Sequence, residues 1–346
     1  MEHLAEYALF FAKTITIIIA FIIPVMVVAA IATRQRQHQK EHLEVNNINR
    51  RYEAMSNAID SVQLPKKIYK ERMKKQKKER KSSNKKDPEE SEKRKRIFVF
   101  NFEGDIEARE IDRLREEITA VLTIAEAPDE VVVKIESRGG VVHGYGLAAS
   151  QLKRIKDQEI LLTVSVDKVA ASGGYLMACV ADKIIAAPFA VVGSVGVLAQ
   201  IPNFHRALEK HNIDYQEYTA GEYKRTVGMF SEPTEKGKAK FMEELEDVHS
   251  LFKEFVQLNR PDVNVDEIST GEHWYGTRAL DLKLVDELRT SDDYLLEASK
   301  ASDIYEVTFV RKEPISDRFK PAFAGLIGSI LSEFIRRNFS RRSGRF

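Results

Sequence analysis

The chain of 346 residues carries 54 Lys and Arg against 53 Asp and Glu, and 43% of its residues are hydrophobic. This hydrophobic content excludes global disorder, and the single cysteine, Cys179, excludes a fold held by intrachain disulfides. The net charge of +1 conceals four segments: residues 1–33 sum to −1, 34–96 to +11, 97–331 to −13 and 332–346 to +4. The chain therefore has an apolar start, a basic neck, an acidic body and a basic tail.

The apolar start, residues 1–33, contains 18 consecutive uncharged residues, Ile15–Ala32. A helix of this length spans about 27 Å, close to the thickness of the hydrocarbon core of a bilayer. A cleaved signal peptide is the rival interpretation, but the apolar run is long, and before it Lys13 stands against Glu2 and Glu6. We therefore predict a transmembrane anchor at 1–33.

The basic neck is predicted to be a linker over residues 34–96. Its second half, 66–96, holds 16 Lys and Arg, 6 Asp and Glu and almost no large apolar side chains, so it has too little apolar surface to form a core. Contact with anionic lipid headgroups and a plain spacer are both compatible with this composition. A nucleic-acid arm is disfavoured, because no RNA- or DNA-binding motif follows.

The body, residues 97–311, alternates apolar strands with amphipathic helices. Strands are predicted at 97–102, 130–137, 159–166, 183–188, 190–199 and 304–310, and helices at 109–127, 144–156, 172–182, 204–212 and 234–259. The uncharged stretch Ile184–Ile201 is interpreted as two core strands rather than a second membrane span, because glycines interrupt it. This alternation predicts an α/β fold with parallel strands covered by helices.

Two glycine turns follow predicted strands and are the best candidates for chemistry. Glu136–Gly140 comes directly after one strand, and Ala170–Tyr175 lies between a strand and a helix. A serine at such a strand-to-helix turn, here Ser172, exposes its hydroxyl, and the next amide points toward a developing oxyanion. A helix N-cap at Ser172 and a tight turn at Gly139-Gly140 explain the same pattern. The residues alone leave these alternatives open.

A nucleophilic serine needs a base. None of the eight histidines stands in an obvious triad order with an aspartate, although spacing alone does not exclude one. A lysine can serve instead when burial keeps it neutral, and Lys224 lies in a glycine-flanked segment before the long helix. An ordinary solvated lysine is the alternative. Cys179, about two helical turns after Ser172, is interpreted as core packing.

Five sequence blocks carry a family resemblance. They are ESRGG (136–140), VDKVAASGGYLMACVADKI (166–184), FAVVGSVGV (189–197), GEYKRTVGMFSEPT (221–234) and HWYGTRALDLKLVDE (273–287). In order and spacing they resemble the signal peptide peptidase A family of membrane serine proteases over about residues 97–290. The anchor followed by a single catalytic unit is similar to the SohB branch of that family.

The resemblance implies a ClpP/crotonase-like fold and hydrolysis of apolar or membrane-proximal peptides by a Ser-Lys dyad. Ser172 matches the family's nucleophile, Lys224 its general base, and Ser194 the serine that orients the lysine. In this family the dyad is assembled from adjacent units, so a ring-forming homo-oligomer is expected. The resemblance implies no metal, no cofactor and no nucleic-acid partner.

The resemblance also assigns the oxyanion donors, with one departure from the family pattern. Gly139 or Gly140, together with Gly173, match the backbone amides that hold the oxyanion. The family turn usually has a proline where this chain has Arg138, and arginine does not preset φ as proline does. We expect the oxyanion turn to survive, because the glycine pair remains.

The rest of the prediction concerns rival functions and location. A catalytically inactive membrane scaffold of the same fold and a crotonase-type acyl-CoA enzyme are the alternatives to a protease. The resemblance implies the bacterial inner membrane and a periplasmic body, whereas the basic residues after the apolar run predict a cytoplasmic one. Residues 312–346 are predicted to form an amphipathic basic tail, which fits a membrane surface, a ring interface or plain terminal packing.

Overall fold

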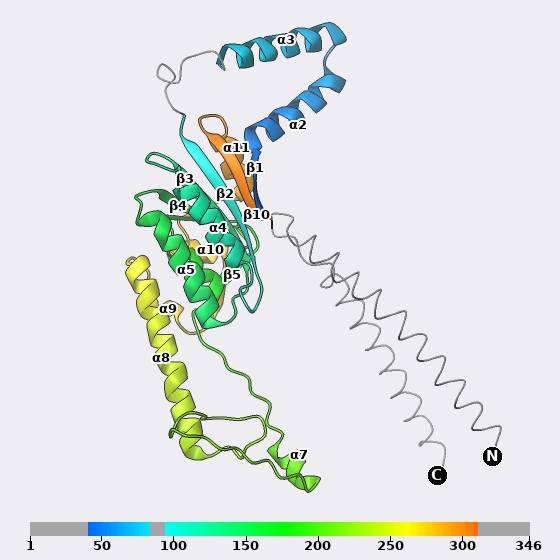
Figure 1. Cartoon of the computed structure of the whole chain (residues 1–346). Coiled ribbons are helices and arrows are strands. Elements are labelled where there is room, and N and C mark those ends of the chain that lie inside the picture. The colour runs from blue at the N-terminus through cyan, green and yellow to red at the C-terminus, as the bar shows by residue number, and fades with distance from the viewer. Residues whose placement is uncertain (1–40, 84–93, 311–346) are drawn as a thin grey trace, which may run out of the picture. The chain divides into compact units, whose positions relative to one another are not determined.

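A computed structural model of the chain describes residues 41–83 and 94–310 (Figure 1). The predicted transmembrane anchor at 1–33 and the predicted tail at 312–346 lie outside these residues. Within the described ranges, no helix combines the length and the apolar content that a membrane span requires.

Ten strands of the described residues form one mostly parallel sheet in the order β1-β10-β2-β3-β4-β6-β9, and β5, β7 and β8 branch from β3. The strands are β1 (His42–Asn47), β2 (Arg96–Gly104), β3 (Glu130–Ser137), β4 (Leu161–Val166), β5 (Val169–Ala171), β6 (Lys183–Ala186), β7 (Val191–Gly193), β8 (His273–Tyr275), β9 (Glu287–Leu288) and β10 (Asp303–Val310). Each neighbouring pair from β10 to β9 is parallel, and β7 pairs with β8 in the antiparallel sense. The predicted α/β class with parallel strands is confirmed.

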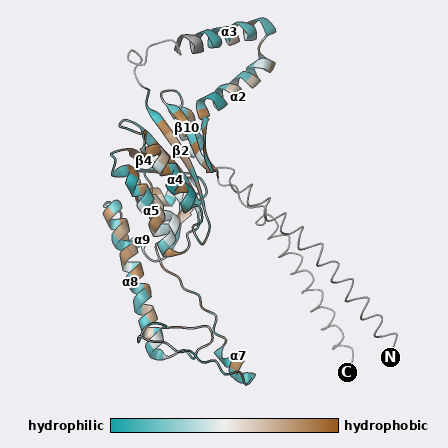
Figure 2. Cartoon of the chain, viewed as in Figure 1, coloured by the Kyte–Doolittle hydropathy of each residue, from teal (hydrophilic) through white to brown (hydrophobic). Residues whose placement is uncertain are grey.

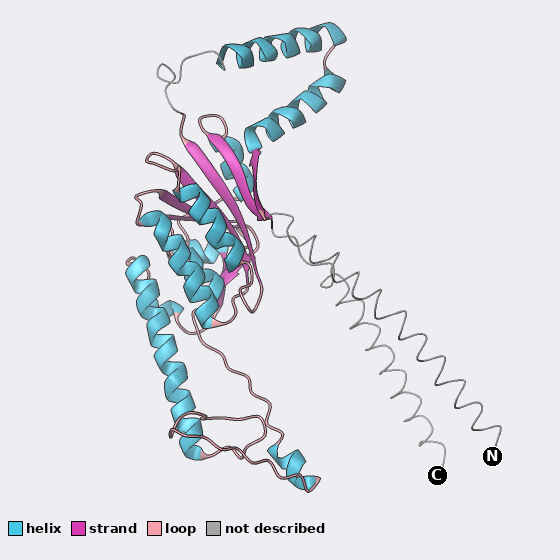
Figure 3. Cartoon of the chain, in the orientation of Figure 1, coloured by secondary structure: helices cyan, strands magenta, loops and turns pink. Residues whose placement is uncertain are grey.

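Helices of very different length accompany the sheet (Figure 3). They are α2 (Ile48–Gln63), α3 (Lys66–Ser83), α4 (Ile111–Leu122), α5 (Val142–Lys156), α6 (Gly173–Ala178), α7 (His205–Lys210), α8 (Glu235–Asn259), α9 (Val265–Ile268), α10 (Gly276–Asp281) and α11 (Ser291–Ala298). In α4, Ile111, Leu114, Ile118 and Val121 are buried at helical spacing, so this helix packs one apolar stripe against the core.

Both faces of the central strands are buried, which explains why their sequences are continuous apolar runs. In β2, Phe98 and Phe100 belong to the core cluster that includes α4 and α5, whereas Ile97 and Val99 belong to a second cluster with Leu295 of α11. Successive side chains of a strand point to opposite faces, so one short run supplies both cores. Figure 2 shows the resulting hydrophobic colour along β2.

The sheet forks at the carboxyl end of β3. Residues 130–134 of β3 pair with β4, but the last residue, Ser137, pairs with β5, and β5 in turn pairs with β7. The fork brings the carboxyl ends of β3, β5 and β7 together, and this edge of a parallel sheet is where α/β proteins bind ligands. The turns that follow the three strands carry Gly139, Ser172 and Ser194.

The prediction of a linker at 34–96 needs correction in its middle. β1 lies beside β10 at the edge of the sheet, and Ile48 at the start of α2 is buried in the second core cluster. The side chain of Asn49 fixes this junction, because it donates to carbonyl oxygens at the end of α11 and beyond it and accepts from the Ile304 amide. The folded part therefore begins before residue 97, and its short, mostly exposed first strand has no apolar run that would indicate it.

Two further differences concern the branch of the sheet. The strand predicted at 190–199 is limited to the three residues of β7, because Ser194 adopts a positive φ of 54° and ends it. No strand was predicted at His273–Tyr275, but this segment forms β8 and pairs with β7. α3 lies in the predicted linker but is helical, and it is coloured mostly as hydrophilic in Figure 2.

Candidate active site

Ser172 lies in the turn between β5 and α6, in a backbone conformation that is rare for a residue with a side chain. Its φ is 51° and its ψ is −118°. Holding a non-glycine residue in such a region costs on the order of 1–3 kcal/mol, and this strain is concentrated at functional sites. The turn is fixed on both sides, because the Ser172 amide donates to the Gly193 carbonyl at 2.8 Å and the Leu176 amide donates to the Ser172 carbonyl at 2.9 Å.

The side chain of Ser172 is not used to cap the helix that follows it. It makes no capping hydrogen bond to α6, and the residue is only half-buried. The N-cap interpretation of this serine is therefore wrong. The amide of Gly173 is the first of α6, a position whose N–H has no carbonyl partner within the helix. A side-chain hydroxyl that makes no capping bond and a backbone donor are thus adjacent at the end of β5.

The Gly139-Gly140 turn after β3 packs directly against Ser172. Gly139 has a φ of +85°, and a Cβ on it would lie 2.6 Å from the Gly173 amide nitrogen and 2.8 Å from the Ser172 Cβ. Only glycine combines this conformation with so close an approach. The Gly139 amide donates to Ser137 Oγ at 3.1 Å and is engaged within the turn, whereas Gly140 is exposed.

Ser194 occupies the third turn of the same edge. Its amide donates to the Glu272 carbonyl at 2.7 Å and its hydroxyl to the Gly271 carbonyl at 3.4 Å. Because the preceding residue, Gly193, accepts the hydrogen bond from the Ser172 amide, the two serines lie on neighbouring turns. The fold brings together Ser172, Ser194 and the glycines of the first turn.

Lys224 is not part of this assembly in one copy. It lies in the segment between β7 and α8 with its side chain exposed, and no hydrogen bond within the described ranges joins it to Ser172. Its neighbours anchor the segment to the start of α8: Glu222 pairs with Lys236, and the amino group of Lys236 lies 5.6 Å from the ring centroid of Tyr223. Figure 1 shows this segment beside the first half of α8.

The segment that carries Lys224, residues 197–234, exposes an unusual amount of apolar surface. Its exposed large hydrophobic side chains are Leu198, Ile201, Phe204, Ile213, Tyr215, Tyr218, Tyr223, Met229 and Phe230. The rings of Phe204 and Tyr215 both lie near that of Phe230, at centroid distances of 6.0 Å and 5.6 Å. Clustered exposed apolar side chains are typical of interaction sites. We call residues 197–234 the Lys224 segment.

Two other residues singled out from the sequence have clear surroundings. Arg138 is exposed, and the glycine pair beside it keeps its turn without the proline. Cys179 is fully buried, and its burial raises the pKa of the thiol to about 12, so the thiolate does not form near neutral pH. The interpretation of Cys179 as core packing is confirmed.

Sequence reasoning missed the support beneath the glycine turn. Tyr145 of α5 is fully buried, and its hydroxyl lies 2.5 Å from Ser137 Oγ and donates to the Asp105 carbonyl at 2.7 Å. The sequence did contain one signal of this support, a tyrosine on a buried helix face. A buried tyrosine hydroxyl requires a hydrogen-bond partner.

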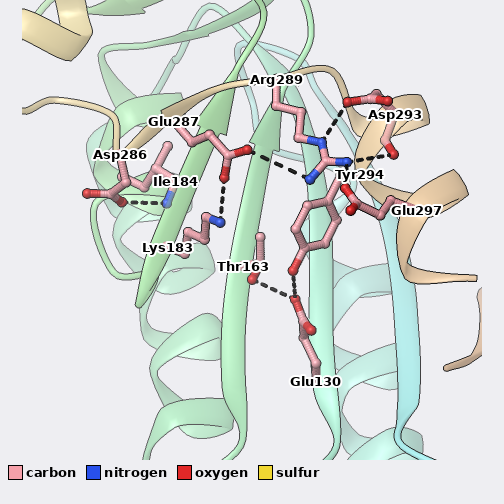
Figure 4. Close-up of polar contacts among 10 residues, drawn as sticks. All are labelled: Glu130, Thr163, Lys183, Ile184, Asp286, Glu287, Arg289, Asp293, Tyr294 and Glu297. Atoms are coloured by element: carbon pink, nitrogen blue, oxygen red, sulfur yellow. Dashed lines mark hydrogen bonds and ion pairs between the residues drawn. The ribbon is translucent and has the colours of Figure 1, made fainter. Parts of the chain in front are cut away.

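A second polar cluster lies at the opposite, amino ends of the same strands (Figure 4). The buried carboxylate of Glu130, the first residue of β3, accepts hydrogen bonds from Lys95 at 2.6 Å, Thr163 at 2.7 Å and Tyr294 at 2.6 Å. Next to it, Lys183 at the start of β6 pairs with a carboxylate of β9 at 2.5 Å. The polar groups named here all have hydrogen-bond or ion-pair partners. We therefore interpret this end of the sheet as a structural network. Elsewhere in 41–83 and 94–310, no three His, Cys, Asp or Glu side chains gather in a way that could hold a metal ion.

Comparisons with known sequences agree with the geometry. The family model described as Peptidase family S49 N-terminal matches residues 2–152, and the model described as Peptidase family S49 matches residues 154–305. The probable protease SohB of Haemophilus influenzae is 48% identical over 329 residues, which cover 92% of each chain. The probable protease SohB of Buchnera aphidicola subsp. Schlechtendalia chinensis is 45% identical over 304 residues, covering 86% of this chain and 99% of its own.

Solved structures are similar over a smaller part of the chain. A membrane-bound stomatin-specific protease aligns with 15% identity and a TM-score of 0.39, over 59% of this chain and 84% of its own. ClpP1 from Listeria monocytogenes aligns with the same identity and TM-score, over 57% of this chain and 94% of its own.

Proposed function

Because the chain belongs to peptidase family S49, as a SohB-type protease, we propose that it is a serine endopeptidase whose nucleophile is Ser172. The observation that carries this assignment is the strained backbone of Ser172 at the carboxyl end of β5, with a side chain that caps nothing. A residue used only to start α6 has no need of this conformation. The proposal includes a ClpP/crotonase-like arrangement of the fork around this turn.

We propose further that the general base, Lys224, comes from a neighbouring copy of the chain. In a single copy Lys224 is exposed, whereas a lysine acts as a base only in its neutral form, which burial favours. The apolar surface of the Lys224 segment supplies a reason for two copies to associate. Ser194, on the turn next to Ser172, is the hydroxyl proposed to orient the incoming amino group. A ring of copies repeats this contact at every site.

The proposed reaction is acyl transfer to Ser172 and then to water. Neutral Lys224 takes the hydroxyl proton as the Oγ of Ser172 bonds to the peptide carbonyl carbon, and the carbonyl oxygen becomes an oxyanion. When the carbon–nitrogen bond breaks, Lys224 returns that proton to the leaving amine. Lys224 then takes a proton from the attacking water, and on collapse of the second intermediate this proton returns to Ser172 as the acid leaves.

The proposed oxyanion donors are the amides of Gly140 and Gly173. The Gly173 amide opens α6, where no intrahelical carbonyl is available to it. The Gly139 amide is a poorer candidate, because it already donates to Ser137 Oγ. Gly139 instead fixes the distance between the two turns through its contact with Ser172. Losing one such donor lowers the rate about 10²–10³-fold.

Peptide hydrolysis by purified full-length variants tests the dyad. We expect Ser172→Ala and Lys224→Ala each to reduce hydrolysis of an apolar fluorogenic peptide to background, because each removes a reacting group. Ser150→Ala and Lys153→Ala, both on α5 and outside the Lys224 segment, are the matched controls and should behave as wild type. Full activity of Ser172→Ala would refute the proposed nucleophile. It would leave the inactive scaffold and the acyl-CoA enzyme as the alternatives.

Mixing the two inactive variants tests whether the dyad spans two copies. If Lys224 serves a neighbouring Ser172, co-assembled Ser172→Ala and Lys224→Ala chains regain about a quarter of wild-type activity, because random mixing completes that share of the contacts. If both groups act within one chain, every site lacks one group and the mixture stays inactive. Homogeneous assemblies of each variant provide the background.

The proposal places the protease in the bacterial inner membrane, held by residues 15–32, with apolar or membrane-proximal peptides as substrates. The side of the membrane is proposed to be periplasmic, although the basic residues of the neck favour the cytoplasm. An externally added protease should degrade the body in intact spheroplasts. Protection until the spheroplasts are broken would instead assign the body to the cytoplasm.

A further inference from the structure

A chain of buried hydrogen bonds connects the glycine turn to the interior of the domain. The Gly139 amide donates to Ser137 Oγ at 3.1 Å, Ser137 Oγ lies 2.5 Å from the Tyr145 hydroxyl, and that hydroxyl donates to the Asp105 carbonyl at 2.7 Å. Ser137 is 2% exposed and Tyr145 is not exposed at all. We call these two hydroxyl groups the turn relay.

The direction of the turn relay follows from the number of protons. The single hydroxyl proton of Tyr145 goes to the Asp105 carbonyl, so between the two hydroxyls Ser137 is the donor. The other acceptor near the Ser137 hydroxyl, the Gly104 carbonyl, is farther away at 3.4 Å. Ser137 in turn accepts the Gly139 amide proton. Burial raises the pKa of Tyr145, so its hydroxyl stays protonated and the direction of the chain is fixed near neutral pH.

The surroundings of the turn relay leave it little freedom to rearrange. Gly104 lies against both hydroxyls, because a Cβ there would collide with the Tyr145 hydroxyl and lie 2.6 Å from Ser137 Oγ. Gly174 packs on the backbone of Ser137, since its Cβ would lie 2.7 Å from the Ser137 carbonyl oxygen. On its outer side the turn is held by the hydrogen bond from the Val141 amide to the Ile106 carbonyl at 2.8 Å. Ring packing fixes Tyr145 itself, since its ring meets that of Phe102 edge to face with the centroids 6.3 Å apart.

We propose that Ser137 and Tyr145 are positioning residues that hold the Gly139-Gly140 turn at the correct distance from Ser172 for the Gly140 amide to bind the oxyanion. The inference rests on the proposed function of Ser172. Neither hydroxyl touches the substrate; both act through the backbone of the turn. A displacement of about 1 Å of a group in such a site lowers the rate about 10²-fold. A relay that keeps the Gly139-Gly140 turn from moving is therefore relevant to catalysis.

The steady-state kinetics of Tyr145→Phe and Ser137→Ala in the full-length assembly test this role. We expect each variant to lower kcat about 10- to 100-fold with KM almost unchanged, because the turn acts on the transition state and not on substrate binding. The matched control is Tyr294→Phe. The Tyr294 hydroxyl also bonds to a buried side chain, but it donates to Glu130 at 2.6 Å, at the opposite end of β3 from the turn. This control should keep the wild-type kcat.

A transition-state analogue separates positioning from a general loss of stability. Ser172 adds to a peptide aldehyde by forming a bond from Oγ to the aldehyde carbon, its proton passing to Lys224, and the aldehyde oxygen then occupies the oxyanion site. The aldehyde should bind Tyr145→Phe more weakly by the same factor as the fall in kcat. Binding of the unreactive substrate to the Ser172→Ala/Tyr145→Phe double variant should match its binding to Ser172→Ala.

The double variant Ser137→Ala/Tyr145→Phe provides a check that does not depend on either single variant folding well. Since both hydroxyls act in one chain, the double variant should lose about as much activity as the more affected single variant. Multiplicative losses, or a wild-type kcat and aldehyde affinity in Tyr145→Phe, would overturn the relay while wild-type activity still depended on Ser172. Absence of Ser172-dependent hydrolysis in the wild type would refute the proposed function itself.

Discussion

At its amino end, strand β3 begins with Glu130, whose buried carboxylate accepts hydrogen bonds from Lys95, Thr163 and Tyr294. At its carboxyl end, the same strand leads into the turn that presses Gly139 against Ser172. Ser172 there occupies a strained conformation, and its side chain makes no capping bond. The polar groups at the amino end of β3 are paired with one another. The carboxyl end leads to the proposed nucleophile and the proposed oxyanion turn.

This difference shows that the two ends of one sheet can have separate roles: one end stabilises the fold, and the other carries the proposed chemistry. Donors that are to bind an oxyanion must remain unpaired and fixed in place, which stabilises the transition state but not the folded chain. The fully paired end and the two apolar cores must offset that loss. We therefore expect substitutions at the two ends to separate into effects on rate and effects on stability.

The largest expected effect comes from filling the contact between the two turns. Gly139→Ala should lower kcat about 10²–10³-fold, because its Cβ has no room beside Ser172 and the oxyanion turn must move. Gly271→Ala is the matched control, since Gly271 has the same φ of +85° but nothing within 4 Å of its Cβ position. Steady-state hydrolysis of an apolar peptide measures both. Equal losses in the two variants would show that backbone strain alone, and not the contact with Ser172, decides the rate.

At the other end, Glu130→Gln should lower the free energy of unfolding by about 3 kcal/mol, because three donors lose a charged acceptor in a buried site. Glu287→Gln in the same cluster is the control. Its ion pair with Lys183 is partly exposed, so a loss of less than about 1 kcal/mol is expected. Urea unfolding gives both values. A large fall in kcat of folded Glu130→Gln would contradict the separation of the two ends.

The sequence was sufficient to predict the α/β class and the central strands, because β2, β3 and β4 are buried on both faces and therefore form unbroken apolar runs. It was insufficient for β1, which lies at the sheet edge with mostly exposed side chains and is fixed by Asn49 and Ile48. Residues that are distant in the sequence provide those contacts, and no local pattern records them. The same reason explains why no strand was predicted for the short β8.

The candidate site was predictable to a different extent at each residue. Ser172 and Gly139 follow strands that lie at a fork in the sheet, so glycine-rich turns were a sufficient signal. The support from Tyr145 was not predictable, because its role depends on the packing of α5 against the Gly139-Gly140 turn, which the sequence does not show. The role of Lys224 stays a prediction, since one copy leaves this lysine exposed.

Another buried carboxylate, Glu117 of α4, sharpens the comparison because it has fewer hydrogen-bond partners than Glu130. One of its oxygens accepts from the Phe309 amide at 2.8 Å, but Oε2 has no hydrogen-bond partner among the described residues. Burial raises the pKa of Glu117 to about 7, and the Phe309 amide and Arg113 oppose this shift only in part. Folded molecules therefore retain a proton that unfolded chains lose above about pH 4.5.

The free energy of unfolding should consequently fall as pH rises from about 4.5 to about 7, because the folded state binds the extra proton in this window. Glu117→Gln stays neutral and still offers an oxygen to the Phe309 amide. It should flatten this fall and gain on the order of 2 kcal/mol over the wild type at pH 8. Urea unfolding at pH 5 and pH 8 measures the difference. An unchanged pH slope in Glu117→Gln would mean that Glu117 is not the group that titrates.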